Sequence, residues 1–265
     1  MKKLSKKDRI ILAVAGVALA IALCCQGWYY WPWFGGKVMR PSRYDWARHS
    51  LSAESSSYNE PLPYITNSSP YSNHQVLKYF KDIACRMEYD RTVDTCRKWV
   101  DPIVLYVTGE YNQDNLQTIQ YLCARLNQIS GFPGISQTEH EETANIVLRF
   151  LGEDDMNNAS GKSTFGYFNI DSSDSYGNIT KISICVRSSM PTEKVSSVLC
   201  EELLQSIGPM NDTKLTDDTL FYQYKWDHPL PTELDWTLLA MLYHPMIRSG
   251  MDYIHCLPFF LEYLK

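Results

Sequence analysis

The stretch EKVSSVLCEELLQSIGP, residues 193–209, decides how this chain folds. Its apolar residues recur at the spacing of one face of an α-helix, and they are Val195, Val198, Leu199, Leu203 and Ile207. Gly208 and Pro209 end the helix, because glycine suits the left-handed position after a helix and proline cannot continue one. The stretch therefore predicts a helix over 193–207 whose apolar face packs against a sheet.

The segments on either side supply that sheet and its other helices. Alternating or β-branched runs predict strands over 103–108, 145–151, 164–170 and 179–186. Helical spacing predicts helices over 73–87, 112–129 and 233–246, the last with Thr232 as its N-cap. Residues 152–162 and 171–177 are polar and predict a loop and a turn. This order favours an α/β or α+β fold with a mixed sheet of about four strands packed by helices.

The N-terminal third has a different composition and predicts a membrane attachment. Residues 1–9 carry five basic side chains, residues 10–25 carry no charge, and aromatic residues continue the apolar run to Phe34. We expect a basic cytoplasmic tail over 1–9 and a transmembrane anchor or signal segment over 10–34. A Pro-, Ser- and Tyr-rich linker over 35–72 and an extracytoplasmic domain over 73–265 follow.

Three fates of the apolar segment fit the same residues. It is an uncleaved single-pass anchor in our preferred interpretation. It is a cleaved signal peptide if Ala20-Ile21-Ala22 is a processing site. It is a lipoprotein signal if Cys24 is lipidated, although Leu23 replaces the small residue expected before such a cysteine. The linker could equally be an irregular arm packed on the domain.

Charge and cysteine content limit the function classes. The net charge is −5 although the first nine residues are basic, so the remainder repels polyanions and we expect no nucleic-acid partner. Of eight cysteines, six follow residue 73, an even number that suits disulfides in an oxidising compartment. Cys85 and Cys96 are the preferred local pair, and buried free thiols are the alternative.

The polar residues of the 193–207 helix and its exit carry the only recognisable site pattern. Positions 201, 205 and 208 follow the spacing of a zincin helix, in which His-Glu-x-x-His binds zinc and the adjacent Glu acts as a general base. Here Glu201 and Gln205 stand at the two histidine positions, Glu202 at the general base, and Asn211 at a third ligand position. A carboxylate and two amides bind zinc poorly, so we expect no metal and no cofactor.

The candidate catalytic residues are Glu201 and Glu202, and the candidate binding residues are Gln205, Asn211 and Asp212. Two carboxyls sharing a cleft could raise each other's pKa and serve as a general acid or base. In the alternative interpretation, the glutamates are solvated and the amides only tie a loop by hydrogen bonds.

Several segments together resemble a bacterial family called domain of unknown function 2927. They are residues 201–208, 211–212, 234–239 and 242–251, with a Trp99-x-x-Pro102 motif before the first strand. The resemblance implies a secreted or lipoprotein-like envelope protein with a zincin/metzincin-like fold that has lost its histidines. Phe221 stands where matrixin-like enzymes carry the methionine of their Met-turn.

These observations predict a membrane-anchored envelope protein whose degenerate peptidase-like domain binds a protein or peptide without catalysis. The alternative is a divergent hydrolase that uses Glu201 and Glu202, with a weakly bound, oxygen-ligated metal.

Overall fold

The computed structural model describes residues 71–88, 90, 92–161, 164–224 and 228–263. The predicted tail 1–9, the membrane segment 10–34 and nearly all of the linker 35–72 lie outside these residues. Within them, no helix combines the length and apolar character needed to cross a membrane.

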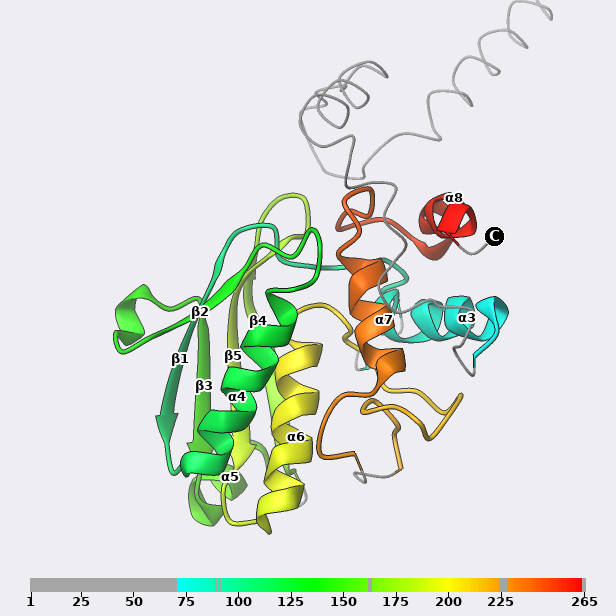
Figure 1. Cartoon of the computed structure of the whole chain (residues 1–265). Coiled ribbons are helices and arrows are strands. Elements are labelled where there is room, and N and C mark those ends of the chain that lie inside the picture. The colour runs from blue at the N-terminus through cyan, green and yellow to red at the C-terminus, as the bar shows by residue number, and fades with distance from the viewer. Residues whose placement is uncertain (1–70, 89, 91, 162–163, 225–227, 264–265) are drawn as a thin grey trace, which may run out of the picture. The chain divides into compact units, whose positions relative to one another are not determined.

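A five-stranded mixed sheet forms one layer of the domain (Figure 1). Its strands are β1 Ile103–Gly109, β2 Ile135–Thr138, β3 Ile146–Leu151, β4 Gly166–Ser173 and β5 Ile179–Arg187. The order is β2-β1-β3-β5-β4; all neighbours run parallel except β4, which runs antiparallel to β5 at one edge. The predicted mixed α/β fold is confirmed, with one strand, β2, that the sequence did not reveal.

Two helices cover one face of the sheet (Figure 1). Helices α4, Gln113–Leu126, and α6, Thr192–Gln205, lie side by side on it. The strand residues facing them are almost fully buried, and they are Ile103, Leu105, Ile146, Leu148, Phe150, Ile182, Ile184 and Val186. These residues alternate along each strand, as expected when one face of a strand packs on a core.

The remaining helices flank this core. Helix α3, Asn73–Ala84, begins with a capping box of Ser72 and Gln75 and packs against α7, Glu233–Leu242. Thr232 caps α7 as predicted. The short helix α5, Glu153–Ser160, replaces the expected polar loop; a 3-10 turn covers Glu141–Thr143, and α8, Tyr253–Tyr263, was not predicted.

Three buried cysteines meet where α3, the segment before β1 and α8 come together. The Sγ atom of Cys96 lies 3.3 Å from that of Cys85 and 3.8 Å from that of Cys256. All six cysteines in the described part of the chain are thiols. The predicted Cys85–Cys96 pair is therefore in contact without a bond, and its disulfide stays a prediction.

Candidate functional site

Glu201 and Glu202 lie in the last turns of α6, and both are buried, with 8% exposure each. Neighbouring helix positions point about 100° apart, so burying both requires cover on two sides. Strand β4 gives one side: a Cβ atom on Gly166 would lie 2.6 Å from Glu202 Oε1 and 2.5 Å from Val198 Cγ1. The glycine thus lets the helix lie against the start of the edge strand.

The turn after α6 supplies the other side. Gly208 has a φ of +139°, and a Cβ there would lie 2.5 Å from the Arg97 carbonyl oxygen. Only glycine fits this backbone conformation and close approach. The chain turns back as the Gly-Pro pair predicts, and Gln205 Nε2 donates a hydrogen bond to Asp212 Oδ1 at 2.8 Å. Two of the three predicted binding residues therefore meet.

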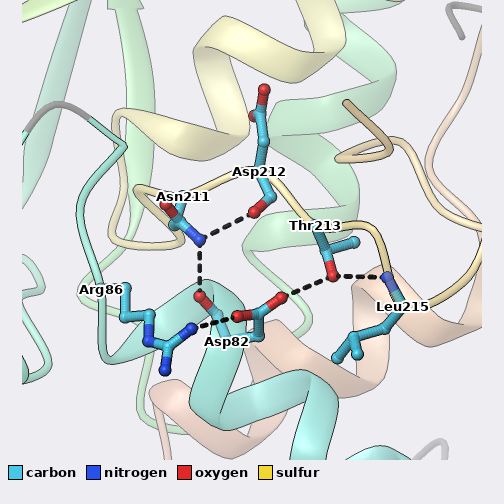
Figure 2. A network of polar contacts seen from close by, with 6 residues as sticks. All are labelled: Asp82, Arg86, Asn211, Asp212, Thr213 and Leu215. Atoms are coloured by element: carbon cyan, nitrogen blue, oxygen red, sulfur yellow. Dashed lines mark hydrogen bonds and ion pairs between the residues drawn. The ribbon is translucent and has the colours of Figure 1, made fainter. Parts of the chain in front are cut away.

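Asn211, the third predicted binding residue, is directed elsewhere (Figure 2). Its Nδ2 donates to the backbone oxygens of Asp82 on α3, at 2.9 Å, and of Asp212, at 2.7 Å. Next to it, Thr213 Oγ1 donates to Asp82 Oδ2 at 2.7 Å, and Arg86 pairs with Asp82 Oδ1 at 2.7 Å. Asn211 thus fastens the loop to α3, while Figure 2 shows the Asp212 carboxylate pointing away from Asp82.

Burial and mutual repulsion favour the neutral forms of these carboxyls. Burial raises the pKa of Glu201 and Glu202 well above 4.5, and the nearby Asp212 and Glu88 charges raise it further. Burial and Glu88 also raise the pKa of Asp212 to about 6, although the hydrogen bond from Gln205 opposes this rise. We call Glu88, Glu201, Glu202 and Asp212 the acidic cluster.

Three members of the acidic cluster have no basic partner in the described part of the chain. Neither glutamate side chain forms a hydrogen bond there, and no Lys, Arg or His pairs with Glu201, Glu202 or Asp212. Among the same residues, Asn115 Nδ2 alone is fully buried without a hydrogen-bond partner. The oxygens of Glu201 and Glu202 also have no hydrogen-bond partner among these residues, so they are not fully buried and keep a small contact with solvent. A ligand could reach them through this opening.

Metal ligands do not gather at this site. No group of three or more His, Cys, Asp or Glu side chains is placed to hold a metal ion within the residues described. His244 is buried elsewhere, where burial and Lys98 lower its pKa to about 4 and its Nδ1 accepts a hydrogen bond from the Met246 N–H.

The edge strand β4 presents unused backbone groups beside the acidic cluster. The N–H of Arg187 donates to the Phe165 carbonyl at 2.8 Å, and in an antiparallel ladder alternate residues bond to the partner strand. The register pairs Gly166 with Val186, so the backbone groups of the odd-numbered residues of β4 bond to β5. The N–H and C=O groups of the even-numbered Gly166, Phe168 and Ile170 point away from β5. No other segment that the structure describes bonds to these outward groups.

Three residues at or near the site, Glu88, Gly166 and Asp235, were not among the predicted site residues. Glu88 follows α3 and Gly166 begins β4, so neither is near α6 in sequence. Asp235 on α7, whose charge contributes to the raised pKa of Glu201, accepts hydrogen bonds from Tyr79, Thr219, Leu220 and Thr232. Only Asp235 had a sequence signal, the Thr-x-x-Asp spacing of a capping box.

A comparison with family models agrees with the extent of this domain. The model described as "Protein of unknown function (DUF2927)" matches residues 73–259. No curated protein matches the sequence. The matched span includes the whole sheet, α6 and the acidic cluster.

Proposed function

The chain belongs to the DUF2927 family, whose description assigns no function, and we propose from its own geometry that the domain binds an extended peptide without cleaving it. The peptide adds to the sheet as a strand beside β4. In this proposal the domain is a degenerate, zincin-like peptidase domain. The segment 10–34 holds it at the outer side of a membrane in a bacterial envelope.

The outward backbone of β4 is the observation that carries the proposal. Strand addition needs an accessible edge whose N–H and C=O groups are unpaired. Gly166, Phe168 and Ile170 offer three such residues in alternation, which is the pattern that an added strand requires. A register shift after Ile170 ends the regular ladder, so the docking length is short.

The side chains around α6 support binding rather than hydrolysis. Where a zincin places imidazoles, this chain has Glu201, Gln205 and Asn211. The amides of Gln205 and Asn211 are already held by Asp212 and by backbone oxygens. A peptide carbonyl beside these groups would find no strong electrophile among the residues present.

A divergent hydrolase is the second candidate, because one observation favours it. A glutamic acid with a raised pKa can donate a proton at neutral pH, and Glu201 and Glu202 are such acids. In that case peptide cleavage would depend on these two side chains.

The test uses the full chain, purified in a mild detergent, and fluorescein-labelled heptapeptides of the pattern Thr-Val-Thr-X-Thr-Val-Thr. Among peptides that differ at position X, the one with the highest affinity is chosen. Its affinity is compared with that of versions N-methylated at each residue in turn. Strand addition predicts that N-methylation at alternate residues abolishes binding and that N-methylation at the intervening residues leaves it unchanged. Binding that is insensitive to N-methylation contradicts the proposal, and cleavage of the peptide that is lost in Glu201→Gln establishes the hydrolase instead.

The membrane attachment is tested separately in cells. We expect the full chain to stay in membranes after alkaline carbonate extraction and to be degraded by protease added from the outer side. Recovery in the soluble fraction, or protection from external protease, contradicts this part of the proposal.

A further inference from the structure

We propose that the bound peptide carries a lysine or arginine opposite Gly166, and that Glu201, Glu202 and Asp212 recognise its charged end. This inference rests on the proposed binding of a peptide along β4 and names the chemistry of that peptide.

The geometry of the edge strand fixes which peptide side chain reaches the acidic cluster. Residues directly opposite each other on neighbouring strands project to the same face of a sheet. The Cβ direction of Gly166 points at α6, 2.6 Å from Glu202 Oε1. The peptide residue paired with Gly166 therefore projects its side chain toward the face on which Glu202 lies.

Because Gly166 has no side chain, Glu202 of α6 lies directly against the edge strand. Any other residue at this position would place its own side chain between the peptide and Glu202, since a single Cβ already meets Glu202 and Val198. A lysine or arginine side chain has a long apolar stem with its charge at the tip. It can pass the strand edge and reach the carboxyls beyond.

The charges nearest the carboxyls favour a cation, and the nearby basic Lys194 of α6 is placed over the Phe165 ring, with its Nζ 3.7 Å from the ring centre. The groups that raise the pKa of Glu201 are Asp212, Glu202, Glu88 from the segment after α3, and Asp235 on α7. Every one of them is acidic. The basic Arg187, at the end of β5 opposite the start of β4, is engaged instead with Thr164, Asn157 and Gly161 oxygens.

An organic cation fits better than a metal ion. The described residues form no group placed to hold a metal, which would need several oxygen ligands at short, fixed distances. An ammonium or guanidinium group needs only hydrogen-bond acceptors at ordinary distances. Glu201 and Glu202 are over nine-tenths buried and make no hydrogen bond in the part of the chain that the structure describes, so their acceptor capacity is open.

Binding of a cation should release protons. In the free protein, burial favours the neutral forms of Glu201 and Glu202, and a positive charge beside them favours ionisation. The affinity for a basic peptide therefore rises with pH, by up to about tenfold per pH unit for each proton released. The affinity for a neutral peptide of the same length has no such dependence.

The experiment measures fluorescence anisotropy of the same heptapeptides with lysine, arginine, norleucine or glutamate at the central position. The proteins are the full chain, Glu202→Gln, Asp212→Asn and the control Glu193→Gln, whose site lies at the exposed start of α6. We expect lysine and arginine to bind at least tenfold more tightly than norleucine in the wild type and the control. In Glu202→Gln and Asp212→Asn the preference falls below about threefold, while norleucine binding persists and thermal melting shows folded protein. If the lysine peptide binds no better than the norleucine peptide, this inference is overturned and the peptide-binding proposal stands. If none of the four peptides binds, both the inference and the peptide-binding proposal are overturned.

Discussion

Replacing Asp212 by asparagine tests the electrostatics of the acidic cluster. Burial and Glu88 raise the pKa of Asp212 from 3.8 to about 6, and each pKa unit corresponds to about 1.4 kcal/mol. Because the folded state holds the proton more tightly than the unfolded chain, stability falls as pH rises from about 4 to about 6. Above pH 6 the cost of ionising Asp212 is about 3 kcal/mol. Asparagine keeps an oxygen acceptor for Gln205 and carries no charge, so Asp212→Asn removes this cost.

The assay is thermal and urea unfolding at pH 4 and pH 7.5. At pH 7.5 we expect Asp212→Asn to be more stable by about 3 kcal/mol, equivalent to about 6–12 °C in Tm for a domain of this size. At pH 4 the two proteins should agree within about 1 kcal/mol. The control Asp101→Asn changes an exposed loop carboxyl and should leave the pH dependence intact. An Asp212→Asn protein that melts at or below the wild type at pH 7.5 refutes the reasoning.

Three further predictions concern stability. Gly166→Ala places a Cβ 2.6 Å from Glu202 Oε1 and should cost about 1–3 kcal/mol in urea unfolding; an unchanged midpoint would show that α6 does not need the glycine. Asp235→Ala leaves five hydrogen-bond donors without their acceptor and should lose about 3 kcal/mol or more, with Asp235→Asn affected less; equal losses would contradict the network. Burial lowers the pKa of Lys98 from 10.5 to about 8, so the unfolding free energy of the wild type relative to Lys98→Met should rise by about 3 kcal/mol from pH 8 to pH 10.5. The comparison cancels the opposite contribution of buried thiols such as Cys123 and Cys200, whose raised pKa values lower the stability of both proteins in this range. A difference between the two proteins that does not change with pH would contradict the assignment to Lys98.

Much of the fold follows from local periodicity. The 193–207 pattern predicts α6 to within two residues, and the alternating runs predict four of the five strands. Strand β2 has only four residues, two of them exposed, so it carries almost no apolar signal. Helix α5 is acidic and buries only Met156, and α8 contains Pro258. Such elements are stabilised mainly by tertiary contacts, and these contacts cannot be read from a local sequence pattern.

The candidate site was predictable only where its residues are close in sequence. Helical spacing places Glu201, Glu202 and Gln205 together, and the Gly-Pro turn accounts for the return of Asp212. The orientation of Asn211 depends on a backbone oxygen of α3, more than a hundred residues away. Contacts of this kind, like that between Gly166 and Glu202, depend on how the edge strand packs on α6 and leave no mark in the local sequence.

The position of Cys96 between two thiols makes the cross-links mutually exclusive, since one sulfur forms only one disulfide. Cys85 is 11 positions away in the chain and Cys256 is 160 positions away. In the chain-entropy account, closing the short loop restricts the unfolded ensemble by about 3 kcal/mol and closing the long loop by about 5 kcal/mol. The choice of partner therefore also decides whether oxidation links the C-terminal helix α8 covalently to the rest of the domain. Without that link, α8 can separate before the rest of the domain unfolds.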